Sequence, residues 1–491
     1  MSRPSADARA RPPGPTQAVP WRLAESVHAG YTAKADLSSF FDWFHSNTDL
    51  VRTRTQRIPL NELDGWRSEP DSGDLVHDSG RFFRVQGLEA HVDAGPVRAW
   101  DQPIIVQPEI GLLGVLAQEF DGVLHFLTHA KAEPGNRHGL QLAPTVQATR
   151  SNYTRVHGGR PVPYLDYFRG TARYRVLADV RQSEQGYWFH RKRNRNMVLE
   201  VPPGEEVPVL PGFHWLTLGQ LHRLLAVEDL VNMDVRTVLS CLPFAGRLLT
   251  GAYAPADDDF RAALVRSCDE TEGARHSDLE NLSWITAIRS NTGVYTRTIP
   301  LNRVRGWHRT EDAISDDDGL FFDVIGVNVE AVGREVGQWR QPMLAPRSVG
   351  LAAFLAARIE GVLHVLVQTR VEPGFVDTVE LAPTVQCNPE RVATLVTEGR
   401  PRFLIDVLDA APSNIRFDTV LSEEGGRFYG ARTRYMIVEA DCADDPLPPG
   451  YRWMALHQLV RLLQHSHYLN VEARTLVACL HSLFGASTEV A

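Results

Sequence analysis

The chain has 491 residues, of which 43% are hydrophobic and 23% charged, the composition of an ordinary globular protein. Its net charge of -9 argues against a nucleic-acid surface, which normally carries a basic patch. Five cysteines without a CxxC pair favour a reducing compartment, and no apolar run is long enough to span a bilayer. We therefore expect a cytoplasmic protein that has neither nucleic acid nor a membrane as a partner.

The first half of the chain is predicted to mix helices and strands. Residues 1–36 are rich in Pro, Ala and Arg without an apolar core run, which predicts a disordered tail and no signal peptide. Apolar spacing predicts a helix over 37–45 and strands over 81–92, 123–133 and 186–201. A closing amphipathic helix carries its core stripe on Trp215, Leu218, Leu221, Leu224 and Leu225.

The same order of elements returns in the second half. A helix is predicted over 279–289, and strands over 320–332, 362–372 and 426–440. The closing helix again has an apolar stripe, on Trp453, Leu456, Leu459, Leu462 and Leu463. Between the halves, residues 245–278 contain Gly, Pro and an acidic run, which predicts a linker with one helix over 260–268.

The two halves are copies of each other. The hexapeptide LAPTVQ at 142–147 recurs unchanged at 381–386, and GVLH at 122–125 recurs at 361–364. The period of 239 residues is too long for a solenoid repeat, so each copy is expected to bury its own core. We expect an α+β protein with repeats at 37–244 and 279–491.

One strand of the first copy gathers titratable side chains. Alternation along residues 125–133 puts His125, Leu127, His129, Lys131 and Glu133 on one face, with neighbours about 7 Å apart. The chain contains only three lysines, so one that survives has a reason to be Lys; its counterpart in the second copy is Arg370, which cannot exchange a proton. Lys131 is a candidate proton donor or stabiliser of a developing negative charge, with Glu133 or His129 as base. The alternative is a solvated strand face with a weak ion pair.

Other side chains are candidates for the same chemistry. Glu109 is a second candidate base, because the second copy has no carboxylate there; alternatively it is an exposed loop residue. Two Arg-x-Arg pairs put guanidinium groups on one face of a strand and suit a diphosphate, unless they form a solvated face. These pairs are Arg193 with Arg195, and Arg432 with Arg434.

Three further residue types complete the candidate set. Trp66 has the shape to stack on a nucleobase, although a core role is favoured for it. Gln147 ends the repeated hexapeptide, where a turn or packing explains it equally well. Asn136 and Asn194 stand where the second copy has Phe375 and Thr433. Proton-transfer groups are therefore concentrated in the first copy, which we expect to hold the working site.

Familiar cofactor motifs are missing from the sequence. It has no GxGxxG after a strand, no GxxxxGK, no HExxH and no Gly-x-Ser-x-Gly. These absences disfavour a tightly bound dinucleotide, P-loop chemistry, the commonest zinc sites and a serine hydrolase. We expect no cofactor and no metal.

Several long segments together resemble the NDP-hexose 2,3-dehydratases. They are FFDWFHSNTDLVRTRTQRIPL, WDQPIIVQPEIGLLGVL, HAKAEPGNRHGLQLAPTVQATRSNY and HRKRNRNMVLEV, with the echoes EPGFVDTVELAPTVQ and GGRFYGARTRYMIVEA. The resemblance implies removal of the C2 hydroxyl of dTDP-4-keto-6-deoxy-D-glucose in deoxysugar biosynthesis. It further implies two tandem Nudix-like domains, a homodimer, one sugar-nucleotide pocket per domain, and a labile product for which a 3-ketoreductase is the expected successor.

Two other functions remain open at this stage. A Nudix-type hydrolase would need clustered glutamates around an Arg-Glu pair to hold magnesium, and the near match Gly333-Arg334-Glu335 lacks them. A non-catalytic protein of similar fold would bind the nucleotide sugar and leave it unchanged. Magnesium separates the first alternative from elimination, because hydrolysis requires the ion and elimination tolerates a chelator.

Overall fold

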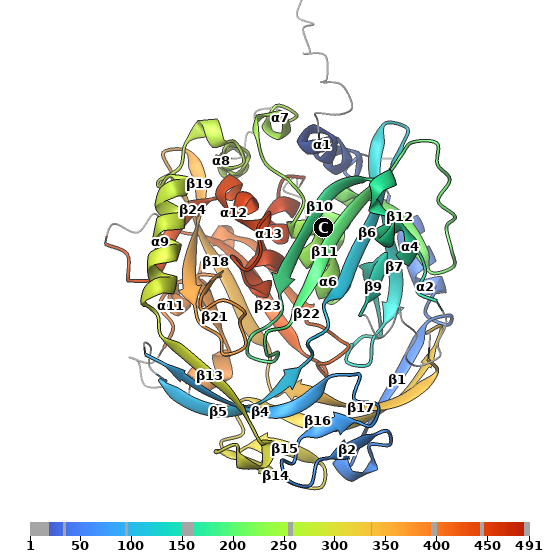
Figure 1. Cartoon of the computed structure of the whole chain (residues 1–491). Helices are drawn as coiled ribbons and strands as arrows, with labels where there is room; N and C mark the ends of the chain where they lie inside the picture. The colour runs from blue at the N-terminus through green and yellow to red at the C-terminus, as the bar shows by residue number, and fades with distance from the viewer. Residues whose placement is uncertain are drawn as a thin grey trace, which may run out of the picture.

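The structure is a computed structural model, and it describes residues 19–32, 36–93, 97–149, 161–253, 259–334, 336–393, 400–441 and 446–485. Two large and two small sheets make up the molecule (Figure 1). The large sheets stand side by side above the small ones, with helices between and around them. In the described residues no helix is both long and apolar enough to cross a membrane.

The large sheet of the first repeat has seven strands in the order β10-β11-β6-β7-β12, with β8 on β7 and β9 on β6. Strand β11 runs parallel to β6 and the other pairs are antiparallel. The strands are β6 (Gly111–Phe120), β7 (Val123–Ala132), β8 (Leu140–Pro144), β9 (Val146–Ala148), β10 (Arg175–Ser183), β11 (Arg193–Val201) and β12 (Phe213–Thr217).

The large sheet of the second repeat has the corresponding order, β22-β23-β18-β19-β24, with β20 on β19 and β21 on β18. The one parallel pair is again in the same place, between β18 and β23. These strands are β18 (Gly350–Ile359), β19 (Val362–Arg370), β20 (Glu380–Ala382), β21 (Val385–Cys387), β22 (Ile415–Ser422), β23 (Arg432–Glu439) and β24 (Tyr451–Ala455).

The small sheets exchange one strand between the repeats. Strand β1 (Arg52–Ile58) of the first repeat pairs along its length with β16 (Phe322–Val332) of the second, and β13 (Val294–Ile299) pairs with β4 (Arg84–Val92). The remaining strands are β2 (Trp66–Ser68), β3 (Leu75–His77), β5 (Ala99–Val106), β14 (Trp307–Arg309), β15 (Ala313–Asp316) and β17 (Gln338–Pro346). The edges of both small sheets are therefore completed by the opposite repeat.

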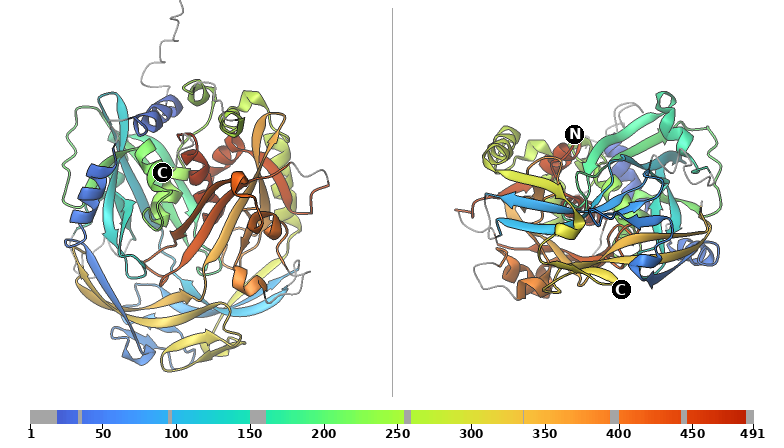
Figure 2. Two further views of the ribbon diagram at one scale, coloured as in Figure 1. Left: turned by 180° about the vertical axis from the view of Figure 1, so that it is seen from behind. Right: turned by 60° about the horizontal axis from the view of Figure 1, so that its bottom comes forward.

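The main core also belongs to both repeats, so the expectation of a separate core for each copy is wrong. Phe126 and Leu142 of the first repeat share one buried cluster with Phe354 and Leu381 of the second. Helices α6 (Met233–Ser240) and α13 (Val471–Ser482) pack together between the two large sheets (Figure 2). The physical reason is that each large sheet turns one apolar face toward this helix pair, and neither face is covered without it.

Two fully buried arginines fasten the helix pair to the sheets. Arg236 on α6 donates from Nη2 to the carbonyl of Ser422 at 2.6 Å, and Arg474 on α13 donates to the carbonyl of Ser183. Each guanidinium therefore bonds to the opposite repeat. Because a buried charge needs partners for its donors, these contacts fix how the repeats meet.

Helix α1 (Val19–Ala29) corrects the predicted disordered tail. Leu23, Ala24 and Val27 are completely buried in the shared core. Ser26 donates to the carbonyl of Leu124 and accepts from the amide of Leu218, as Ser267 on α8 (Asp259–Ser267) does with Leu363 and Leu456. The apolar i, i+1, i+4 stripe was hidden by the Pro- and Arg-rich composition of the whole segment. Residues 1–18 lie outside the described residues.

The correspondence of α1 and α8 also moves the repeat boundaries. The first repeat begins by residue 19, and α8, the expected linker helix, is the second repeat's copy of α1. A Cβ on Gly219 would clash with the carbonyl of Val27, so α1 requires a glycine there to approach this closely. Short helix α7 (Arg247–Thr250) lies between the repeats.

Most of the other predicted elements are present with shifted ends. The opening helices are α2 (Ser38–Ser46) and α9 (Asp278–Asn291). The closing helices, α5 (Leu218–Leu224) and α12 (Leu456–Leu463), begin later than predicted, because Trp215 and Trp453 belong to β12 and β24, where they pair with the neighbouring strand. The outer faces of the large sheets carry α4 (Leu165–Arg169) and α11 (Leu404–Leu408), and α10 (Pro389–Ala393) follows β21.

Candidate active site

The end of β7 carries the best-supported part of the predicted site. Phe126, Ala130 and Ala132 face the shared core, so alternation turns Lys131 to the opposite face, as predicted. The Lys131 ammonium lies 3.2 Å from Oε1 of Glu133, and the two side chains are only 13% and 6% exposed. Gln147 on β9 donates to the same carboxylate oxygen at 3.0 Å. Three predicted residues therefore meet in a buried position, not on a solvated face.

The Glu133 carboxyl is held in its ionised form. Burial alone would raise its pKa, but the nearby charges of Lys131 and Arg334 and the hydrogen bond from Lys131 together lower it below the ordinary value. At neutral pH the group is therefore a carboxylate, the form that a general base needs.

A second lysine joins this cluster. Lys192 donates from its ammonium to the backbone carbonyl of Glu109, which places the predicted Glu109 beside the site. Burial lowers the pKa of Lys192 to about 8, although the charge of Glu184 opposes the shift. The scarcity of lysine that singled out Lys131 applied equally to Lys192, so the sequence did contain this signal. Lys34, the third lysine, lies outside the described residues.

The second repeat contributes side chains to the same place. Arg334, in the turn between β16 and β17, donates to the carbonyl of Ala132 at 2.9 Å. The loop after β22 brings Glu424 and Arg427, and the amide of Gly135 donates to the carbonyl of Gly425 at 2.7 Å. These residues were missed because each copy was assumed to build its own site.

Burial gives the surrounding carboxyls unequal proton affinities. Asp234, on the first turn of α6 behind its Asn232 cap, has a pKa raised well above its ordinary value by burial and by neighbouring carboxylates. Burial and the charge of Glu133 raise the pKa of Glu424 to about 7. We call this whole cluster the first centre: Glu109, Lys131, Glu133, Gln147, Glu184, Lys192, Asp234, Arg334, Glu424 and Arg427.

Buried polar atoms without a hydrogen-bond partner gather in the first centre. Within the described part of the chain they are Gln147 Oε1, Glu184 Oε2, Asp234 Oδ1, Glu424 Oε2 and Arg427 Nε. Asn136 Oδ1 and Asn196 Oδ1, from the adjoining loop and strand, behave alike. Buried polar groups normally have partners, so such a concentration is typical of a site that binds a polar molecule.

The equivalent place in the second repeat, the second centre, is more completely bonded. Arg370 and Gln386 both donate to Oε1 of Glu372, at 2.8 and 3.3 Å, and the amide of Gly186 donates to Oε2 at 2.8 Å. Gln386 in turn accepts from Asn470 at 2.7 Å, whereas the matching oxygen of Gln147 has no partner among the described residues. We define the second centre as Tyr187, Arg370, Glu372, Gln386, Glu423, Asn470 and Glu472.

The remaining candidates of the first copy lie near the first centre, and they differ in the contacts that they make. His129 stacks on Phe213 with ring centroids 4.2 Å apart, and burial lowers its pKa to about 3, so it is neutral at physiological pH. Asn194 donates to Glu184 at 2.6 Å and accepts from the amide of Gly111. The amide of Asn136 bonds to the carbonyl of Gly139 in its own loop.

The two arginines of each Arg-x-Arg pair do not both offer a free guanidinium group to one ligand. Arg195 binds Asp179 through Nε and Nη2, both at 2.6 Å, and Arg434 binds Asp418 in the same way on the other large sheet. These partially exposed pairs link neighbouring strands. Arg193 lies close enough to His467, across the repeat boundary, for its charge to help burial lower the pKa of that ring. The structure therefore favours the strand-face interpretation for Arg195 and Arg434.

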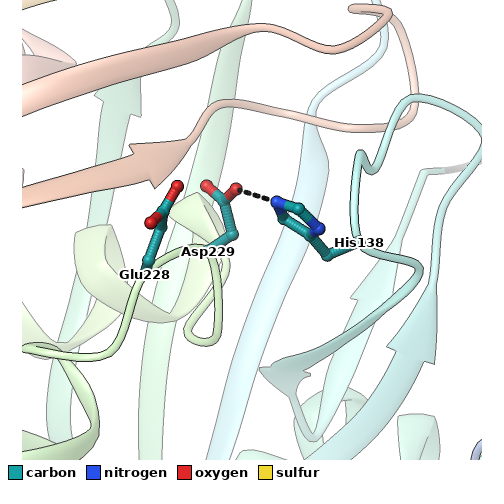
Figure 3. Close-up of side chains that lie close together, drawn as sticks. All are labelled: His138, Glu228 and Asp229. Carbon is teal, nitrogen blue, oxygen red and sulfur yellow. Dashed lines mark ion pairs between the residues drawn. The ribbon is translucent and has the colours of Figure 1, made fainter.

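Arg432 instead belongs to a bridge between the repeats. His138, Glu228 and Asp229 of the first repeat have ligand-type atoms within 4.8 Å of one another, and the His138 ring lies 3.4 Å from Asp229 (Figure 3). The Arg432 guanidinium lies 3.0 Å from Asp229 and also contacts Glu228. A fixed cation already balances these carboxylates, so the arrangement is explained as an ion cluster that joins the two repeats.

Trp66 is part of the packing between the small sheets. Its ring lies 4.8 Å from that of Phe83, and its indole N–H donates to the carbonyl of Arg340 in the other repeat at 2.8 Å. Trp307 makes the mirrored bond to the carbonyl of Asp101. This agrees with the core role favoured from the sequence and leaves no indole face for a nucleobase in the first centre.

A surface cavity of about 280 Å³ lies elsewhere, at the exchanged strand β13. It is lined by charged residues that include Glu89, Asp101, Arg297 and Arg305. Two of its arginines are already paired, Arg297 with Glu89 and Arg305 with Asp101. The buried polar atoms of the first centre that have no partner among the described residues lie away from this cavity.

The first centre has the character of an enzyme site for proton transfer. Carboxyls of unequal pKa, two buried lysines and several unpartnered polar atoms are what acid–base catalysis requires. A charged cluster of this kind also suits an anionic substrate.

Comparison with known proteins identifies the family. The model of the NDP-hexose 2,3-dehydratases matches residues 37–242 and 278–480. Three curated relatives are each described as a dTDP-4-dehydro-6-deoxy-alpha-D-glucopyranose 2,3-dehydratase. That of Saccharopolyspora spinosa is 48% identical over 94% of this chain and 95% of its own, and that of Amycolatopsis orientalis 48% identical over 90% and 89%. That of Streptomyces violaceoruber is 46% identical over 91% and 98%.

The chain belongs to the NDP-hexose 2,3-dehydratase family, which confirms the resemblance noted in the sequence. It is therefore an enzyme, a lyase that removes water from a sugar nucleotide.

Proposed function

We propose that the chain removes the C2 hydroxyl of dTDP-4-keto-6-deoxy-D-glucose as water and forms a dTDP-3,4-diketo-2,6-dideoxyhexose. The substrate for which three relatives at 46 to 48% identity are named supports this choice. The C4 ketone acidifies the C3 proton, so a base removes it and the electron pair expels the C2 hydroxyl. The resulting C3 enol takes a proton at C2 and becomes a ketone. Carbon 3 is oxidised and carbon 2 reduced within one molecule, and only water is lost.

The first centre supplies the groups that this elimination needs. Glu133 is ionised and serves as the base, while Lys131, 3.2 Å away, stabilises the enolate oxygen or returns the proton. His129 is a weaker candidate base, because its ring is stacked on Phe213 in a buried position. Glu109 stands next to Lys192 and is kept as an alternative base.

The binding of the diphosphate is assigned to the cations that face this centre. Arg334 and Arg427 lie close enough to Glu133 for their charges to lower its pKa. Arg427 also has a buried Nε without a partner in the described residues. Gln147, Asn136 and Asn194 offer hydrogen bonds to the sugar. We propose that turnover occurs in the first centre alone, and that the second centre binds nucleotide sugar without turnover or supports the fold.

One observation carries this proposal above the others. Among the described residues the first centre holds five buried polar atoms without a partner, whereas the second centre holds one, Glu472 Oε2, and its Arg370, Glu372, Gln386 and Asn470 are bonded to one another. The second centre therefore has fewer groups left to offer a substrate.

The test is mass spectrometry of the purified protein mixed with dTDP-4-keto-6-deoxyglucose, with and without a chelator. Loss of one water under both conditions is the expected result. Release of a nucleoside monophosphate that requires magnesium would instead establish a Nudix-type hydrolase. An unchanged substrate that nevertheless binds would establish a non-catalytic binding protein.

We further propose that each repeat is a Nudix-like domain, that the protein forms a homodimer in the cytoplasm, and that a 3-ketoreductase takes the diketone. The matching strand orders of the two large sheets support a duplicated domain. The lability of an activated diketone supports a prompt successor. Light scattering of the purified protein tests the dimer: a mass of one chain would exclude it.

A further inference from the structure

In the loop after β22, in the second repeat, two adjacent glutamate side chains point to different centres. Glu423 accepts from the hydroxyl of Tyr435 at 2.8 Å and from Gln185 at 3.1 Å, both in or beside the second centre. Glu424 points into the first centre, where it interacts with Glu133, Glu184, Lys131 and Arg427. The second repeat therefore sends one carboxyl to each centre.

Glycines let Glu424 approach Glu133 closely. A Cβ added to Gly425 would lie 3.0 Å from the Cβ of Glu133. A Cβ added to Gly426 would clash with Oε1 of Glu424 and would lie 3.7 Å from Oε1 of Glu133. Both carboxyls are therefore next to the same point in space. Oε2 of Glu424 is buried and has no hydrogen-bond partner among the described residues.

We propose that Glu424 of the second repeat is the general acid of the first centre, which donates a proton to the C2 hydroxyl as it leaves. This inference rests on the proposed function. In the step, the C3–H bond breaks and its proton goes to Glu133. The C2–O bond then breaks with the electron pair going to oxygen, which takes the proton of Glu424 and departs as water. Glu424 is left as a carboxylate, and solvent restores its proton.

The surroundings of the two carboxyls fit this division of labour. Two neighbouring carboxyls cannot both ionise without cost, and a pair whose pKa values are driven apart is the usual acid and base of one site. Lys131 and Arg334 favour the charged form of Glu133. Burial and the charge of Glu133 hold a proton on Glu424 up to about pH 7, against the opposing charges of Arg427 and Lys131.

The second centre has neither a glutamate nor a glycine at the positions equivalent to Glu424 and Gly426. Its residue at the position of Glu424 is Gln185, an amide that cannot act as a general acid. At the position of Gly426 it has Tyr187, whose ring lies 5.2 Å from the Arg370 guanidinium. Where the first centre is left open by a glycine, an aromatic ring covers the second.

Glu424→Gln tests the assignment in D₂O with dTDP-4-keto-6-deoxyglucose. The base is intact, so we expect deuterium to enter at C3, detected by NMR, while water loss falls about a hundredfold or more. Water loss within threefold of the wild type would overturn the proposal. Loss of both exchange and elimination in a variant that melts like the wild type would also overturn it.

Two controls separate this result from folding and from the proposed function itself. Glu439→Gln changes a largely buried carboxylate that lies in neither centre, where it pairs with Arg358 and Arg416, and is expected to keep both exchange and elimination. The wild-type rate should fall as the pH rises above about 7, where Glu424 loses its proton, and that dependence should be absent from the residual rate of Glu424→Gln. If the wild type itself releases no water, the proposed function fails, whatever the role of Glu424.

Discussion

The first and second centres have the same architecture and different chemistry. Both place a cation and a buried glutamate at the end of the equivalent strand, with a glutamine from the repeated hexapeptide bonded to the carboxylate. In the first centre the cation is Lys131, a second lysine lies nearby, and several polar atoms have no partner among the described residues; in the second centre the cation is Arg370, which a tyrosine ring covers, and most polar groups bond to one another. The comparison teaches that two sites in equivalent positions can differ mainly in how completely their polar groups are bonded.

The largest effect is expected from the cation of each centre. Lys131→Ala should lower the rate of water loss by about 10² to 10⁴, the usual contribution of an acid–base group, whereas Arg370→Ala should change it little. Liquid chromatography with mass detection of the dehydrated product measures both. The conservative exchanges Lys131→Arg and Arg370→Lys keep the buried carboxylates paired if the alanine variants fold poorly. If Arg370→Lys were inactive and Lys131→Arg remained active, the second centre and not the first would be the site of turnover.

The next effect concerns the space above each centre. Gly426→Tyr puts a ring where Tyr187 stands in the second centre and pushes Glu424 aside, so kcat/KM should fall about a hundredfold or more. Tyr187→Gly, which opens the second centre, should leave turnover at the first unchanged. Steady-state kinetics measures both variants. Full activity of Gly426→Tyr would mean that the sugar does not enter past this glycine.

The pH dependence offers a smaller and more specific effect. The pKa of Lys192 is lowered to about 8, so the side chain is charged below that pH and loses its charge as the pH rises through it. If the charge is needed, the alkaline decline of kcat/KM steepens above about pH 8. Lys192→Arg, whose charge persists, should remove that added steepness and keep the decline due to Glu424. An identical profile for the variant would show that the charge of Lys192 is not required.

The smallest effect is expected at the exposed arginine pairs. Arg195→Ala breaks a pair with Asp179 in which both side chains are about a third or more exposed, so we expect stability to change by no more than about 1 kcal/mol. KM should be unaffected, and Arg434→Ala provides the matched case in the other repeat. Thermal melting and steady-state kinetics check these two points. A tenfold rise in KM for Arg195→Ala would restore this residue to diphosphate binding.

Local features of the site were predictable from the sequence. Strand alternation and the rarity of lysine identified Lys131, Glu133 and Gln147, and the structure brings these three together. Both signals act within a few residues, where the period of a strand decides which way a side chain points. The same reasoning extended to Lys192 would have found the second lysine.

Long-range features were not predictable in this way. The edge of β4 can be completed equally well by β1 of its own repeat or by β13 of the other, because the two strands are copies with nearly the same pattern. The sequence therefore left open which of the two centres Arg334, Glu424 and Arg427 of the second repeat would join. Helix α1 was missed for a different reason: its buried apolar stripe has only three residues and lies in a segment of unfavourable composition.

The exchange of β1 and β13 makes each half of the molecule depend on the other. Each strand completes a sheet of the opposite repeat, so one repeat alone would leave a sheet edge uncovered, and the first would lack the loop that carries Glu424. Truncating the present chain after the first repeat would expose the edge of β4, a template for aggregation, and would strip the reacting site of its partner loop.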